Sequence, residues 1–64
     1  MRGTRFESKE IKLGYDKLGV AGSWSFFVSE KENEWKWVRV GMIYKSKAEL
    51  LADAHRYATE NWGF

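Results

Sequence analysis

Apolar and polar residues alternate in three stretches of the chain with the period of two that is typical of a β-strand. The stretches cover residues 10–15, 23–29 and 35–44. Residues 16–22 contain two glycines and must turn, and the polar residues 30–34 predict a hairpin loop of ordinary length. We therefore expect three consecutive antiparallel strands.

A helical pattern follows, and it opens with the capping box Ser46-Lys47-Ala48-Glu49. The predicted helix runs from about Lys47 to Asn61, and Gly63 stands where a C-cap glycine belongs. Its apolar stripe comprises Leu50, Leu51, Ala54, Tyr57, Ala58 and Trp62. Because a lone hairpin is marginal in water, this stripe is expected to cover one face of the sheet. The prediction is an α+β fold with a three-stranded antiparallel sheet and one C-terminal helix.

The length allows a single small domain over residues 1–64. Residues 1–9 alternate charges around one aromatic residue, Phe6, so they form either a flexible arm or an edge strand. On the first stretch Ile11, Leu13 and Tyr15 would share one face, and on the second Trp24, Phe26 and Val28 would do so. With only one helix, nothing else in the chain covers the opposite face of the sheet.

The third stretch can meet the helix in two registers. If Val38, Val40 and Met42 face the helix, then Trp35, Trp37 and Arg39 lie on the open face of the sheet. In the other register the tryptophans belong to the core and the valines face a second small cluster. Strand periodicity does not choose between them, and a bulge at Gly41 would let the strand change faces.

The composition limits the chemistry that this chain can perform. It has no cysteine, which excludes disulfides and cysteine-based zinc sites, and no apolar run suggests a signal peptide or a membrane span. The single histidine, His55, lacks further ligands at metal-binding spacing. Glu30, Glu32 and Glu34 are more typical of a solvated hairpin tip than of paired catalytic carboxylates. We expect a cytoplasmic, non-enzymatic protein without a catalytic site, metal or cofactor.

The charge is unevenly distributed although the net charge is only +2. Residues 30–34 have a net charge of −2, whereas residues 35–47 carry four cations and no acidic residue. That basic block also contains three aromatic residues, Trp35, Trp37 and Tyr44. Exposed tryptophan beside arginine is typical of protein interfaces, and also of sheets that stack unpaired bases.

Part of the chain resembles the repeat unit of the small YegP-like family, whose function is unknown. The resemblance lies between Phe27 and Leu51 and rests on Phe27, Glu34-Trp35-Lys36-Trp37, Arg39 and Tyr44-Lys45-Ser46-Lys47-Ala48. The strand–strand–helix outline is also similar to that of three-stranded DNA-binding modules. Both resemblances imply the outline of a fold, and neither implies a site or an activity.

Two functions are consistent with these features. The first is a small regulator, such as an accessory or phage-encoded inhibitor, that docks on a protein partner. Its expected partner-binding residues are Phe27, Trp35, Lys36, Trp37, Arg39, Tyr44 and Lys45. The alternative is a nucleic-acid-binding module that combines Trp35 or Trp37 with Lys36, Arg39, Lys45 and Lys47, and with Arg2 and Arg5. A chain this short also gains stability by pairing with a copy of itself, so a homodimer is a further expectation.

Overall fold

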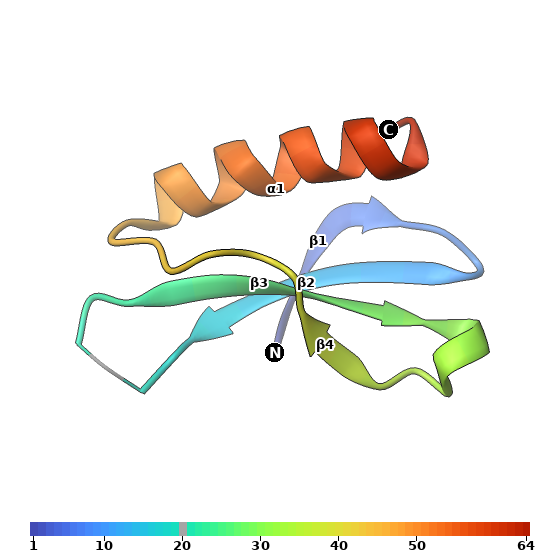
Figure 1. Cartoon of the computed structure of the whole chain (residues 1–64), viewed down its shortest axis with the longest axis horizontal. Coiled ribbons are helices and arrows are strands. Elements are labelled where there is room, and N and C mark those ends of the chain that lie inside the picture. The colour runs from blue at the N-terminus through green and yellow to red at the C-terminus, as the bar shows by residue number, and fades with distance from the viewer. Residues whose placement is uncertain (20) are drawn as a thin grey trace.

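The computed structural model describes residues 1–19 and 21–64, which form a four-stranded antiparallel sheet with one helix on one face (Figure 1). The strands lie in the sheet in chain order. They are β1 (Arg2–Glu7), β2 (Ile11–Lys17), β3 (Trp24–Glu30) and β4 (Trp37–Arg39). The short 3-10 helix η1 (Lys31–Asn33) precedes β4, and the helix α1 (Lys47–Trp62) ends the chain. The described part of the chain has no helix with the length and apolarity that crossing a membrane requires.

The α+β class is confirmed, but the sheet has four strands rather than the predicted three. The additional strand is β1, which pairs with β2, so residues 2–7 form an edge strand rather than a flexible arm. Phe6 anchors this strand in the core, and the Thr4 hydroxyl donates a hydrogen bond to the Leu13 carbonyl at 2.9 Å. The sequence left this choice open because charged residues are compatible both with an arm and with an edge strand.

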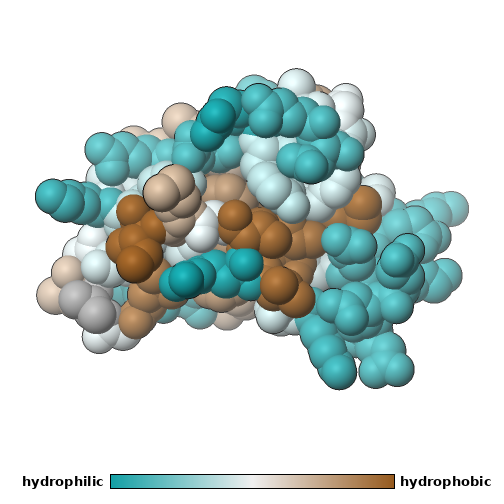
Figure 2. Space-filling model, viewed as in Figure 1, coloured by the Kyte–Doolittle hydropathy of each residue, from teal (hydrophilic) through white to brown (hydrophobic). Residues whose placement is uncertain are grey.

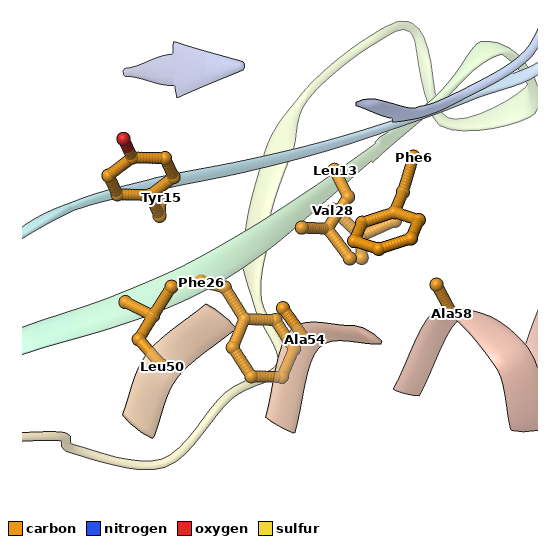
Figure 3. Packing of buried hydrophobic residues seen from close by; sticks show 8 residues of the cluster. All are labelled: Phe6, Leu13, Tyr15, Phe26, Val28, Leu50, Ala54 and Ala58. Carbon is orange, nitrogen blue, oxygen red and sulfur yellow. The ribbon is translucent and has the colours of Figure 1, made fainter. Parts of the chain in front are cut away.

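The core lies between α1 and the faces of β2 and β3 that it covers (Figure 3). Its buried apolar residues are Phe6, Leu13, Tyr15, Phe26, Val28, Leu50, Ala54 and Ala58. Both strand faces predicted from the period of two are confirmed, with Ile11 and Trp24 packed at the margins. Fully burying one large apolar side chain contributes about 1.5–3 kcal/mol, so a few rings carry most of the stability of so small a domain.

The predicted helix is confirmed together with both of its caps. The Ser46 side chain accepts a hydrogen bond from the Glu49 backbone N–H at 3.2 Å, and Gly63 adopts a left-handed conformation as the C-cap. Within the predicted apolar stripe, Leu51 departs from expectation because its side chain is 37% exposed. The reason is that α1 packs most extensively against β3, which leaves the side of the helix nearer β1 uncovered.

The turn between β2 and β3 uses Gly19 and Gly22, whose φ angles are 80° and 74°. Such left-handed conformations favour glycine, as the predicted turn over residues 16–22 requires. Val20 of that turn lies outside the described residues.

The third predicted strand, residues 35–44, is much shorter than expected because its backbone bulges after Arg39. The backbone N–H groups of Val40 and Gly41 both donate to the Phe26 carbonyl, at 3.3 and 3.2 Å. Four residues then span the distance that two residues span on β3, before Tyr44 pairs with Trp24. The surplus is accommodated outward, so Met42 and Ile43 are 74% and 64% exposed.

A hydrogen bond ties the end of this segment to α1. The Tyr44 hydroxyl donates to Asp53 Oδ2 at 2.6 Å, and Arg56 donates to Asp53 Oδ1 at 3.0 Å. The pKa of the Asp53 carboxyl lies below its ordinary value of 3.8. The main cause is the hydrogen bond from the Tyr44 hydroxyl, and the Arg56 guanidinium acts in the same direction. The ionised carboxylate therefore helps to fasten the bulged segment to the helix.

Replacement of Gly41 by alanine should destabilise the fold by about 1–3 kcal/mol, because a larger residue overpacks a filled core. A Cβ atom at this position would lie 2.5 Å from the Phe26 ring, which is buried. Gly3→Ala is the matched control, because a Cβ atom at Gly3 meets nothing within 4 Å. Urea denaturation followed by tryptophan fluorescence measures both changes, and equal stabilities for the two variants would contradict the packing described at Gly41.

The variant Asp53→Asn should lose stability relative to the wild type at neutral pH and much less so in acid. Because the folded-state pKa of Asp53 is depressed, the carboxylate stabilises the fold above its ordinary pKa of 3.8. That contribution disappears as the pH falls through the lower folded-state value. Thermal unfolding of both proteins from about pH 7 to about pH 2 should show the stability gap closing below about pH 4. A gap that stays constant would contradict this assignment.

Candidate functional site

The face of the sheet turned away from α1 gathers most of the residues expected to bind a partner. Arg39 pairs with Phe27 and Trp37 pairs with Ser29, and directly opposite residues of antiparallel strands point to the same side. Because the alternate residues of β3 point into the core, these four residues point away from the helix. We define the aromatic face as Lys12, Phe27, Trp35, Trp37 and Arg39.

The structure adopts the first of the two registers that the sequence left open. Val38 lies opposite the core residue Val28, on the side of the sheet that faces the helix. Val38 and Val40 nevertheless stay exposed, because α1 does not extend over the edge strand β4. Trp35 and Trp37 lie on the other side and are 37% and 41% exposed. Each tryptophan is therefore partly packed and partly available for contact.

Small residues on β2 and β3 make room for the Trp37 ring. A Cβ atom added to Gly14 would come within 3.0 Å of Trp37 Cη2, so this ring reaches from β4 across the sheet to β2. Ser29 lies between the two positions, directly opposite Trp37, and is only 1% exposed. The ring thus reaches over a strip of small residues, which leave room for it on the sheet.

Trp35 is presented by a backbone segment that is conformationally strained. Glu34 and Trp35 have φ angles of 56° and 58°, in the left-handed region that L-residues with side chains rarely occupy. The Trp35 backbone N–H donates to the Glu30 carbonyl at 2.9 Å, and the Glu34 N–H donates to the Lys31 carbonyl at 3.1 Å. These bonds hold the backbone of Trp35, and Lys12 Nζ lies 4.8 Å from the centroid of its ring.

Three of the expected binding residues do not join the aromatic face. Tyr44 lies on the helix side, where its ring stacks on Phe26 and its hydroxyl bonds to Asp53. Lys36 lies in the loop before β4, and Lys45 immediately precedes the helix N-cap. Conversely, sequence reasoning missed Lys12. The sequence did contain a signal for this residue. Lys12 alternates with the core residues of β2, and this alternation places Lys12 on the face opposite the helix.

A second exposed region consists of apolar residues near β4. Figure 2 shows apolar surface in a band beneath α1, where the segment after β4 crosses in front of the sheet. Its exposed residues are Val38, Val40, Met42 and Ile43. Val38 lies on the helix side of β4, opposite Val28, and Val40 and Met42 line a hollow together with Asp53 of α1. This apolar band is therefore distinct from the aromatic face.

Other reactive side chains are dispersed. Among the described residues 1–19 and 21–64, no group of three histidine or carboxylate side chains comes together as a metal site would require. His55 is exposed on α1, with its ring centroid 5.3 Å from that of Phe6. No protein-family model, curated protein or solved structure matches this chain. The resemblance of residues 27–51 to the YegP-like repeat stays a prediction.

The strain beside Trp35 can be tested by replacing Glu34 with glycine. Glycine adopts positive φ readily, so Glu34→Gly should raise the unfolding free energy by about 0.5–1 kcal/mol. Glu32→Gly in the neighbouring 3-10 helix is the control, because glycine there relieves no positive φ and should leave stability equal or lower. Denaturant titration measures the unfolding free energies of the wild type and of both variants. If Glu34→Gly is no more stable than Glu32→Gly, the strained conformation is contradicted.

Proposed function

We propose that this chain is a small non-enzymatic binding protein that docks on a protein partner through its aromatic face. The observation that carries the proposal is the pair of half-exposed tryptophans beside Arg39 and Lys12, on the one face of the sheet that α1 leaves open. Tryptophan and arginine are the residues most enriched among the hot spots of protein interfaces. A regulator or inhibitor is the role that fits a face of this kind on so small a domain.

The fixed positions of the two rings also support the proposal. Trp37 lies over Gly14 and Ser29, and the backbone hydrogen bonds of the η1 loop hold Trp35. A side chain that is ordered before binding loses less conformational entropy in the complex, so more of its contact energy remains as affinity. Strained backbone persists only where surrounding structure holds it, and it concentrates at functional sites.

The charges of the aromatic face favour a protein over a nucleic acid. Lys12 pairs with Glu7 on β1, and Asp16 follows on the same face of β2, so cations and acids alternate there. The η1 loop beside Trp35 adds further carboxylates that would meet phosphates. Nucleic-acid affinity depends on several cations contacting the phosphate backbone, whereas a protein interface needs a few aromatic and arginine anchors. We therefore expect a partner that presents an apolar centre with carboxylates at its border.

Truncation of the aromatic face should abolish partner capture. Tagged wild-type protein is incubated with a lysate of its source organism, and bound proteins are quantified by mass spectrometry. Trp37→Ala and Arg39→Glu should each weaken binding by about 2 kcal/mol or more, because central anchors dominate interface energies. Met42→Ala and Lys9→Glu make matched changes outside the aromatic face and should retain the partner. Equal capture by all four variants would exclude this face as the docking site.

The nucleic-acid alternative is tested separately with oligonucleotides. Single- and double-stranded DNA and RNA are titrated into the protein while tryptophan fluorescence is recorded at two salt concentrations. Under the proposed function no quenching is expected. Saturable quenching that weakens steeply as salt rises would instead support base stacking with phosphate contacts, and would replace the protein partner by a nucleic acid.

A further inference from the structure

A groove runs between β1 and α1, on the side of the sheet opposite the aromatic face. Its volume is about 540 Å³, within the range of about 300–1,000 Å³ typical of small-molecule sites. Phe6 and Tyr15 form its aromatic floor, and Leu51 and Ala52 contribute an apolar wall from α1. The groove explains why Leu51 is exposed although it belongs to the apolar stripe of the helix.

The path of β1 maintains this groove. The register between β1 and β2 shifts between Gly3 and Glu7, and within this stretch the Thr4 hydroxyl bonds to the Leu13 carbonyl. The helix packs instead mainly against β3. Only Phe6 reaches from β1 into the core, so among residues 1–19 and 21–64 no side chain fills the outer part of the space between strand and helix.

Two permanent cations and one imidazole line the groove. Arg5 contributes from β1, Lys47 from the first turn of α1, and His55 from the helix about two turns later. Among the described residues that line the groove, none carries a carboxylate. Asp53 of α1 is bonded instead to Tyr44 and Arg56. Two permanent cations and an imidazole thus surround an apolar floor.

Each of the two permanent cations lies close to a ring of the aromatic floor, although both residues are exposed. The Arg5 guanidinium lies 5.1 Å from the Phe6 ring centroid, and Lys47 Nζ lies 5.3 Å from the Tyr15 ring centroid. The Lys47 side chain beside the Tyr15 hydroxyl holds the pKa of that phenol below its ordinary value, and Arg2 acts in the same direction. The cations beside the groove therefore act on the Tyr15 hydroxyl, which lies on the groove floor.

We propose that this groove binds a small amphipathic anion, with an apolar body on the Phe6–Tyr15 floor and a carboxylate, sulfonate or phosphate group facing Arg5 or Lys47. An apolar surface with a few convergent polar groups is the usual composition of a ligand pocket. Hydrogen bonds between an anion and a guanidinium or ammonium group are stronger than neutral ones, so the cations fix the orientation of the ligand. The site is independent of the aromatic face, which lies across the sheet.

The probe for the test is 8-anilinonaphthalene-1-sulfonate, which combines an aromatic body with one sulfonate. It is titrated into the full-length 15N-labelled chain while amide chemical shifts and probe fluorescence are recorded. Saturable binding is expected, with the largest shifts at Arg5, Phe6, Leu51 and His55. Arg5→Glu and Leu51→Asp should each weaken binding about tenfold or more, since each removes a contact and adds a repelled charge.

Lys9→Glu is the matched control, because it makes the same charge change as Arg5→Glu at the exposed turn between β1 and β2. It should bind the probe as tightly as the wild type, and the neutral analogue N-phenyl-1-naphthylamine should bind about tenfold more weakly than the sulfonate. Amide shift dispersion confirms that each variant is folded. The proposal is overturned if the shifts map to the apolar band or the aromatic face, if Arg5→Glu binds like Lys9→Glu, or if no saturation occurs below about 1 mM.

Discussion

The whole structure depends on one geometric constraint, which is that a single helix is too narrow to cover four strands. A helix with its side chains is about 10 Å wide, whereas adjacent strands are about 4.8 Å apart, so α1 covers about two strands. Those two strands, β2 and β3, supply most of the buried core from the sheet. On one side of the helix the uncovered margin is the groove along β1. On the other side it is the apolar band near β4.

The face of the sheet away from the helix is protected in a different way, by aromatic rings rather than by a second layer. Gly14, Ser25 and Ser29 place small residues along this face, and all three are buried. Trp37 lies over Gly14 and Ser29, and the Ser25 hydroxyl donates to the Met42 carbonyl at 2.7 Å. Each ring therefore has one side on the protein and another side toward solvent, which makes the same residues both a cover for the sheet and a surface for contact.

Sequence patterns predicted the elements whose signals are local. The N-cap at Ser46, the C-cap at Gly63 and the period of two on β2 and β3 each depend on residues close together in the chain, and all were confirmed. Which face of the third stretch meets the helix depends instead on how that strand pairs with β3. A shift of the pairing by one residue would exchange the valines with the tryptophans, and both sets are apolar, so the pattern does not choose between them. The same limitation left β1 undecided between an arm and an edge strand, because Phe6 anchors it through a distant contact. It also concealed Lys12, whose neighbour Trp35 comes from a distant loop.

Both edges of the sheet are poorly suited to pairing with a further strand. β4 has only three residues and ends in a bulge, while β1 has a register shift and carries charged residues between Arg2 and Glu7. Short, bulged or charged edges are the features by which natural sheets avoid edge-to-edge association. A partner that added a strand would gain few backbone hydrogen bonds at either edge. The edges therefore disfavour extension of the sheet, and this agrees with the two proposals, which both place contacts on the faces of the molecule, at the aromatic face and at the groove.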